Sequence, residues 1–157
     1  MSPRMQRLRA EILSDLQAFA GRVEVLASLS RLSDAGPPTL AEAAVALHHA
    51  YGAVEAALTR IARAIDDGLP EGSDWHQALL HTMGLAIDKV RPAVLRPETR
   101  ALMQRLLGFR HFFRHAYALE LDGTRLEDLR ACAQTVLPLL SEDLRRFDDF
   151  LAEASQA

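Results

Sequence analysis

The stretch TLAEAAVALHHAYGAVEAALTRIARAI, residues 39–65, has an apolar residue at every third or fourth position without interruption. This spacing places the apolar side chains along one face of an α-helix of about seven turns. The face consists of Leu40, Ala44, Leu47, Tyr51, Val54, Leu58, Ile61 and Ile65. Thr39 and Glu42 match a capping box, in which each side chain satisfies a free amide of the first turn. They predict that the helix begins at this point.

The segment before this helix and the segment after it have the same spacing. Apolar residues at positions 5, 8, 12, 16, 19, 23 and 26 predict a first helix from about Pro3 to Leu32. Beyond the loop DDGLPEGSD, Ser73 or Asp74 is suited to cap a third helix, which Pro92 is expected to end.

Two more helices are predicted in the last third of the chain. A fourth helix begins at Pro97, because proline is tolerated in the first helical turn, and runs toward Leu121. A second capping box, Thr124 with Glu127, opens a fifth helix. Pro138 lies inside that helix and is expected to kink or split it.

The whole pattern predicts an all-α fold, an up-and-down bundle of about five helices in a single domain spanning residues 1–157. No segment alternates polar and apolar residues as a half-buried strand does. The single cysteine, Cys132, cannot form an internal disulfide and is expected to be a small buried residue. No apolar run is long enough to span a bilayer, and the first residues do not resemble a signal peptide, so we expect a cytoplasmic location.

Charge is distributed unevenly along the chain, whose total is −3. Residues 91–114 contain six arginines and one acid, for a net +5, so the remainder carries −8. The arginines are Arg91, Arg96, Arg100, Arg105, Arg110 and Arg114. We interpret this stretch either as a local surface for an anionic partner or as an ordinary solvated helix face.

The end of the fourth helix carries an unusual set of side chains, FRHFFRHAY, residues 109–117. At about 100° per residue, Arg110 and Tyr117 share a face, whereas Arg110 and His115 are about 140° apart. A straight helix therefore does not direct Arg110 and His115 at one small group, but two copies of it meeting at a symmetry axis can. Phe112 lies off the apolar face and is expected to be covered by a partner. We therefore predict a homodimer.

Arginine and histidine without nearby carboxylates suit cleavage of RNA without a metal. Histidine has a pKa of about 6.5 and can take the proton from the ribose 2′-OH, while a guanidinium stabilises the charge that develops on the phosphate. A metal site at His111 and His115 is disfavoured because no acid or cysteine completes the set. We expect no metal and no cofactor.

The spacing Arg110, four residues, His115, one residue, Tyr117 resembles the R-x4-H-x-Y motif of HepT-like toxins in the HEPN superfamily. The resemblance implies a small dimeric all-α toxin that cuts RNA without metal, with Arg110 and His115 as catalytic residues. It further implies a partner, a minimal nucleotidyltransferase antitoxin that adds AMP to the motif tyrosine, here Tyr117. His111 and Arg114 lie inside the motif and are candidates for contacts to RNA phosphate, although solvated positions suit them equally.

Two alternatives belong to other classes of protein. The same bundle would also suit a non-catalytic subunit that binds nucleotide or RNA for a nucleotidyltransferase, or a plain dimeric scaffold. Among residues outside the motif, Tyr51 and Glu55 project together from the second helix. Glu55 is a candidate for orienting a motif side chain, but we favour a solvated surface position for it. The histidine pairs at positions 48 and 49 and at positions 76 and 81 receive no role.

Overall fold

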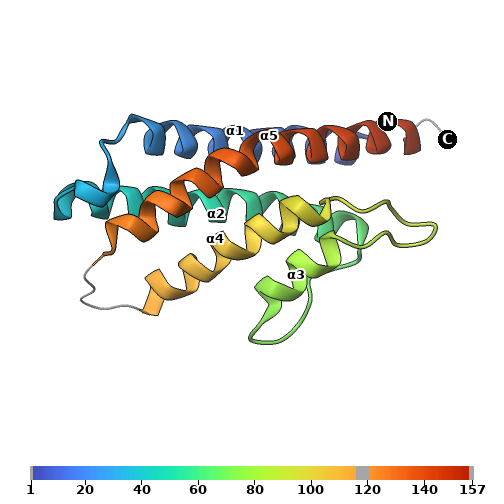
Figure 1. Cartoon of the computed structure of the whole chain (residues 1–157). Coiled ribbons are helices and arrows are strands. Elements are labelled where there is room, and N and C mark those ends of the chain that lie inside the picture. Colours follow the sequence, from blue (N-terminus) through green and yellow to red (C-terminus); the bar gives the residue numbers. More distant parts are fainter. Residues whose placement is uncertain (1, 116–120, 156–157) are drawn as a thin grey trace.

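The computed structural model describes residues 2–115 and 121–155, with the side chains of residues 114 and 115 left out. This part of the chain contains five α-helices and a short 3-10 helix, and no named strand (Figure 1). They are α1 Pro3–Ser28, η1 Leu32–Asp34, α2 Pro37–Ile65, α3 Trp75–Met83, α4 Pro97–His115 and α5 Gly123–Ala154. The predicted all-α fold is confirmed. In the described ranges no helix is long and apolar enough to cross a membrane.

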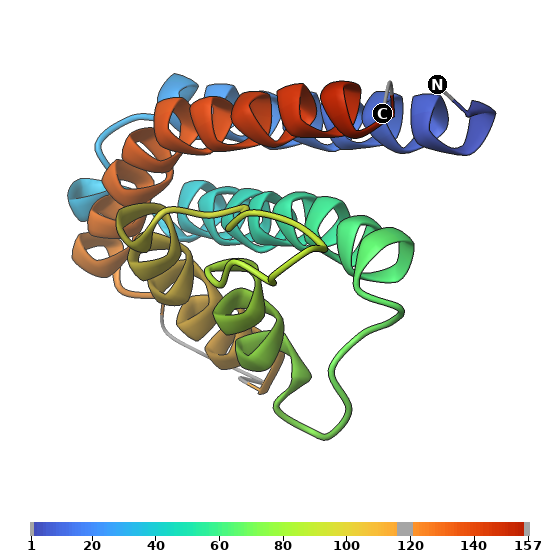
Figure 2. The ribbon, with the colours of Figure 1, turned by 90° about the vertical axis from the view of Figure 1, so that its right-hand side faces the viewer.

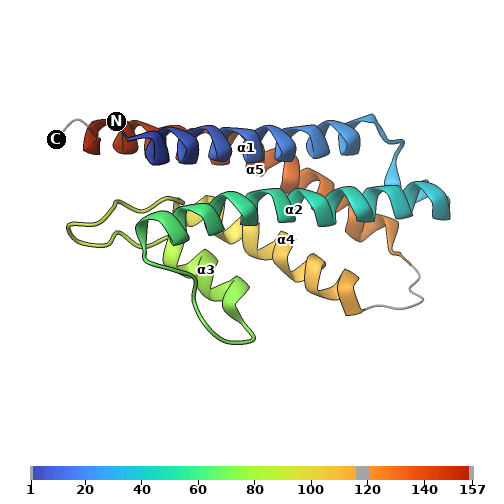
Figure 3. The ribbon, with the colours of Figure 1, turned by 180° about the vertical axis from the view of Figure 1, so that it is seen from behind.

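The helices form an up-and-down arrangement around α2. Figure 1 and Figure 2 show α1 side by side with the later part of α5, α2 next to both, and α3 and α4 on the opposite side of α2. Accordingly α2 contacts all four other α-helices, and among the helices described here α3 contacts only α2 and α4. Figure 3 shows the same order from behind, with α4 and α3 next to α2 and away from α1. The helix predicted from the long apolar stretch is thus the central element of the bundle.

Burial along α2 follows the predicted apolar face. Within it the buried members of that face are Ala44, Leu47, Tyr51, Val54, Leu58 and Ile61. Leu40 and Ile65, at the two ends, are only partly buried. Side chains from every helix and from η1 complete one core, which explains why the spacing was informative in all segments.

The first helix ends four residues earlier than predicted, at Ser28. The backbone after it is held by side chains of α5: Arg130 Nη1 donates to the carbonyl oxygens of Leu26 and Leu29 at 3.0 Å. The amide of Leu32 donates to Glu127 at 2.8 Å. These long-range bonds satisfy the backbone groups that another helical turn would have paired, so the helix stops.

Both predicted capping boxes are wrong. The first turn of α2 begins at Pro37 with Gly36 as its cap and no capping side chain, because proline needs no amide partner there. The cap of α5 is Asp122, whose carboxylate accepts from the amides of Thr124 and Arg125. Glu127, the other half of the predicted box, binds the loop after α1 instead.

The third helix ends at Gly84 and does not continue to Pro92. The chain turns back there, since the amides of Val94 and Leu95 both donate to the carbonyl of Met83. Arg91 fixes the turn: its guanidinium is fully buried, donates to the carbonyl of Leu85, and forms two hydrogen bonds of 2.6 and 2.7 Å with Asp66. A buried arginine thus replaces the predicted helical turn.

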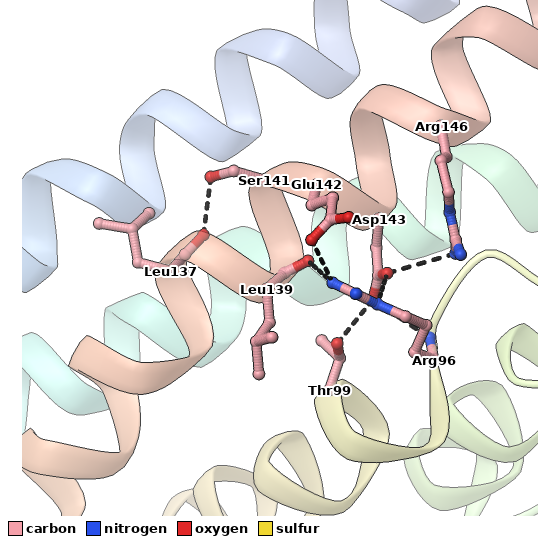
Figure 4. A network of polar contacts seen from close by, with 8 residues as sticks. All are labelled: Arg96, Thr99, Leu137, Leu139, Ser141, Glu142, Asp143 and Arg146. Carbon is pink, nitrogen blue, oxygen red and sulfur yellow. Dashed lines mark hydrogen bonds and ion pairs between the residues drawn. The ribbon is translucent and has the colours of Figure 1, made fainter.

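A polar network attaches the start of α4 to the middle of α5 (Figure 4). Asp143 is fully buried and accepts from the amide of Arg96, from its Nε, and from the hydroxyl of Thr99. Five residues earlier, Pro138 leaves α5 continuous, and Figure 1 shows the helix bending near its middle, where this proline lies. Of the two predicted outcomes at Pro138, the kink is the one observed.

Candidate functional site

The described part of the motif lies on the last turns of α4. Leu106 and Phe109 are buried and Phe113 is partly buried, as the predicted apolar line requires. Phe112 is 37% exposed, off that line, and its ring lies 4.6 Å from the guanidinium of Arg125 on α5. Phe112 is therefore the exposed aromatic that the spacing predicted, with one cation–π contact inside the chain.

Arg110 points into the bundle and not toward solvent. Its side chain is only 14% exposed, and its guanidinium carbon lies 5.7 Å from the centre of the Tyr51 ring. Nη2 is 3.8 Å from Oε1 of Glu55, the limit of an ion pair. Nη1 is buried and has no hydrogen-bond partner among the residues that the structure describes. A guanidinium thus reaches the interior with an uncommitted donor, which costs free energy unless a ligand completes it.

Glu55 is buried between α2 and α3 and belongs to a second polar contact. His76, near the start of α3, places Nδ1 2.6 Å from Oε2 of Glu55, and both side chains are about a tenth exposed. Because a carboxylate only accepts, the proton of this bond lies on Nδ1, in the neutral or the charged ring. One buried acid is therefore shared by His76 and Arg110.

Aromatic contacts hold the two histidines in place. The ring of His76 stacks on Trp75 at 3.9 Å between centroids. The ring of His111 meets that of His76 edge to face at 5.8 Å. We call Tyr51, Glu55, His76, Arg110 and His111 the polar cluster; three helices, α2, α3 and α4, contribute to it.

Tyr51 is the most buried aromatic residue of the polar cluster, and its pKa reflects this burial. Burial is the main cause that raises the pKa of this phenol, and the nearby Glu55 raises it further. Arg110 acts in the opposite direction but more weakly. Tyr51 therefore stays neutral at physiological pH, and its ring face lies against Arg110 beside the carboxylate of Glu55.

A comparison with known families decides how this arrangement is understood. A family model described as HepT-like protein matches residues 42–151, about two thirds of the chain and all of the polar cluster. The chain belongs to the HepT-like family. No curated protein and no solved structure matches the sequence. Membership places this HepT-like protein in the HEPN superfamily and suggests a toxin with ribonuclease activity.

Three of the motif side chains that the sequence predicted lie outside the described residues. His115 is the last residue of α4, but only its backbone is described, and the same holds for Arg114. Tyr117 lies wholly outside. The helix has no described break between Arg110 and His115, so the two residues stay about 140° apart around its axis, and the argument for a second copy is unchanged.

For Glu55 the favoured interpretation was wrong, and an orienting role toward the motif stays a prediction. A solvated position was expected, but the side chain is buried and contacts Arg110 of the motif. The signal was present in the sequence, because Glu55 lies between Val54 and Leu58 on the buried face, four residues after Tyr51. His76 was missed altogether, since nothing local connects it to an acid 21 residues earlier in the chain.

The arginine-rich stretch of residues 91–114, which we call the positive zone, has fewer unpaired cations than its arginine count implied. Arg91 is paired with Asp66, Arg96 with Glu142 and Asp143, and Arg110 with Glu55. These acids come from α2 and its cap and from α5, outside the stretch whose charge was counted. In the described ranges, Arg100 and Arg105 have no ion pair, so they are the cations of this zone that remain available there.

Metal ligands and cavities give no competing site. In the ranges described, no group of three or more His, Cys, Asp and Glu residues could hold a metal ion. A cavity of about 520 Å³ opens between α1 and α5, lined largely by apolar side chains such as Leu13, with Arg9 and Asp148 at one side. It contains no histidine, so we place the candidate site at the polar cluster and not there.

Proposed function

We propose that this HepT-like protein is the toxin of a toxin–antitoxin pair and acts as a metal-independent endoribonuclease. The observation that carries the proposal is Arg110: its Nη1 donor is buried without a described partner, on the helix that also contains His115. Phosphate oxygens are strong acceptors for a guanidinium, and RNA supplies them. Family membership points to the same chemistry.

The reaction needs only a base and a stabiliser of negative charge. His115 takes the proton of the ribose 2′-OH, and the 2′-oxygen forms a bond to phosphorus. Arg110 stabilises the pentacovalent phosphate as its charge increases. The bond from phosphorus to the 5′-oxygen then breaks, and that oxygen takes up a proton. The products are a 2′,3′-cyclic phosphate and a 5′-hydroxyl.

The proposal includes a homodimer. Arg110 and His115 of one straight α4 are about 140° apart, so one chain does not place both on a single phosphate. A two-fold axis beside α4 places the arginine of one protomer next to the histidine of the other. Phe112, exposed on this helix, is suited to lie in such an interface.

Cleavage with purified protein tests the enzyme. Wild type should cut single-stranded RNA in the presence of EDTA, and Arg110→Ala and His115→Ala should each reduce the rate by roughly 100-fold or more. Arg145→Ala is the matched control, since this arginine is 65% exposed on α5 and, among the described residues, pairs only with Asp149. Equal cleavage by wild type and His115→Ala would refute the enzyme. RNA binding without cleavage would favour the alternative, a non-catalytic subunit of a nucleotidyltransferase.

Oligomeric state is tested separately. Light scattering at micromolar concentration should give twice the chain mass of 17.3 kDa. Phe112→Asp should shift the protein toward monomer and abolish cleavage while far-UV circular dichroism is retained. A wild-type monomer that still cuts RNA would contradict the shared site.

We further propose that a minimal nucleotidyltransferase is the antitoxin and adds AMP to Tyr117. An anionic nucleotide attached to Tyr117, seven residues after Arg110 in the sequence, would compete with RNA phosphate for the guanidinium. Co-expression should increase the intact mass of wild type by whole AMP units, and Tyr117→Phe should show no gain. The same gain in both proteins would place the modification elsewhere.

A further inference from the structure

The two oxygens of Glu55 are used unequally. Oε2 is 2.6 Å from Nδ1 of His76, whereas Oε1 is 3.8 Å from Nη2 of Arg110. We propose that His76 is a positioning residue for Arg110: by holding Glu55, it prevents the carboxylate from closing on the guanidinium and keeps that guanidinium available to phosphate. This inference rests on the proposed function, in which Arg110 binds the RNA phosphate.

Two other arginines of the chain form ion pairs in which both carboxylate oxygens accept a hydrogen bond. Asp66 forms two hydrogen bonds of 2.6 and 2.7 Å with the buried Arg91. Asp148 forms two bonds of 2.5 and 2.7 Å with Arg9. Such two-point pairs are the preferred geometry of arginine with a carboxylate. The long contact between Glu55 and Arg110 departs from this preference, and the departure needs a cause.

His76 supplies that cause because its own position is fixed. The His76 ring is buried and stacks on Trp75. His76 is the second residue of α3, a helix packed on both α2 and α4. Its Nδ1 proton binds one carboxylate oxygen in either protonation state of the ring. Glu55 is therefore held by His76 of α3, in addition to a hydrogen bond with the Tyr51 hydroxyl of its own helix, and Arg110 keeps Nη1 without a protein acceptor in the described part.

The arrangement predicts a specific pattern of double-mutant effects. With His76→Leu, Glu55 is released and closes on Arg110, so phosphate binding should weaken roughly tenfold or more, the size of a hydrogen bond between charged groups. Glu55→Gln in the same background removes the competitor and should restore binding. With His76 present, Glu55→Gln should raise affinity, because it removes the negative charge 3.8 Å from Nη2 of Arg110. His76→Asn, whose amide NH₂ can still donate to Glu55, should bind nearly as well as wild type.

The test measures binding without cleavage. A fluorescently labelled 2′-O-methyl oligoribonucleotide lacks the 2′-OH nucleophile, so its dissociation constant is read by anisotropy from intact ligand. Wild type, the three single variants and His76→Leu/Glu55→Gln are compared, with circular dichroism and thermal melting to verify folding. A purely structural role for His76 predicts a double variant no better than His76→Leu and no rescue by His76→Asn, and that outcome overturns the inference.

Two arms keep the test decisive if His76→Leu does not fold. Glu55→Gln and His76→Asn conserve size and burial. Weaker binding by Glu55→Gln would mean that Glu55 assists phosphate binding and would overturn the inference. Arg110→Ala separates this failure from a failure of the proposed function. Unchanged RNA affinity in Arg110→Ala would mean that the guanidinium does not bind RNA, which refutes the proposed function. Weaker RNA binding by Arg110→Ala without the predicted effects of the His76 and Glu55 variants would refute only the present inference.

Discussion

Replacing Asp143 should destabilise the bundle far more than replacing Glu142, although both carboxylates bind Arg96 (Figure 4). Asp143 is fully buried and accepts from the Arg96 amide at 3.1 Å, from Arg96 Nε at 2.6 Å and from Thr99 Oγ1 at 2.6 Å. Arg146 donates to it at 3.3 Å. Glu142 is 52% exposed and has one contact, of 3.0 Å, with Arg96 Nη2.

The magnitude follows from this difference in burial. Asp143→Ala leaves the buried hydroxyl of Thr99 without its acceptor and deprives Arg96 of its buried one, although Glu142 and the Leu139 carbonyl still accept from that guanidinium. Breaking a buried charged pair costs about 3–5 kcal/mol. Each bond to a charged group contributes about 1.5–3 kcal/mol, so two of them alone reach that range. Glu142→Ala should cost at most about 1 kcal/mol, as exposed ion pairs do. A domain has about 5–15 kcal/mol in total, so Asp143→Ala removes a large share.

Urea unfolding followed by circular dichroism measures both variants. The midpoint should fall markedly for Asp143→Ala and barely for Glu142→Ala, with similar slopes, because the unfolded surface is the same. Asp143→Asn, which retains one acceptor oxygen, should lie between them and remain folded for comparison. Equal losses for Asp143→Ala and Glu142→Ala would refute the argument that burial, and not the presence of an ion pair, determines the effect.

Three further outcomes concern stability. A Cβ at Gly123 would lie 2.1 Å from the carbonyl oxygen of Leu32, so Gly123→Ala should lower the free energy of unfolding by about 1–3 kcal/mol. Gly21 lies in open space within α1, so Gly21→Ala should raise the free energy of unfolding by about 0.5–1 kcal/mol in the same urea titration. Hydrogen bonds, first from Arg130 and then from the amide of Leu32, hold the pKa of Glu127 below its ordinary value of 4.5. The stability that this carboxylate contributes is complete above pH 4.5 and is lost as the pH falls through the lower pKa of the folded state. Glu127→Gln should therefore flatten the decline of stability below pH 4.5. Burial raises the pKa of Tyr51, so the folded state resists ionisation and stability falls above about pH 10, where the unfolded phenol ionises. In Tyr117→Phe, which leaves Tyr51 as the one tyrosine of the sequence, the 295 nm absorbance of tyrosinate should appear only with unfolding, and a gradual appearance in folded protein would contradict this.

The sequence predicted elements well and their ends poorly, for two physical reasons. Apolar spacing is local, and burial at Leu47, Tyr51 and Leu58 repeats it. The ends depend on partners remote in the chain: Arg130 stops α1 and Arg91 replaces the last turn of α3. No local pattern contains such partners. The two capping boxes failed for a different, local reason, because Gly36 with Pro37 and Asp122 begin these helices before the predicted positions.

The candidate site, like the helix ends, could be predicted only where local sequence determines it. The apolar face of α4 and the exposed position of Phe112 could be predicted from the spacing of the motif, whereas the burial of Arg110 was not predicted. The pairing of Glu55 with His76 could not, because it joins α2 to α3 across a loop. The roles of His115 and Tyr117 in catalysis and modification stay predictions.

Neutralised arginines have a consequence for how the protein would meet a polyanion. Each phosphate of single-stranded RNA that a protein cation neutralises releases about 0.7 of a condensed counterion, and this release sets the salt dependence of binding. In the described ranges, Arg100 and Arg105 of residues 91–114 have no carboxylate partner, and Arg110 has a single long contact with Glu55 and a free Nη1. Affinity should therefore decline with ionic strength much less steeply than six arginines would dictate. Recognition would then rely on short-range fit at a few phosphates, and long-range attraction to any nucleic acid would be weak.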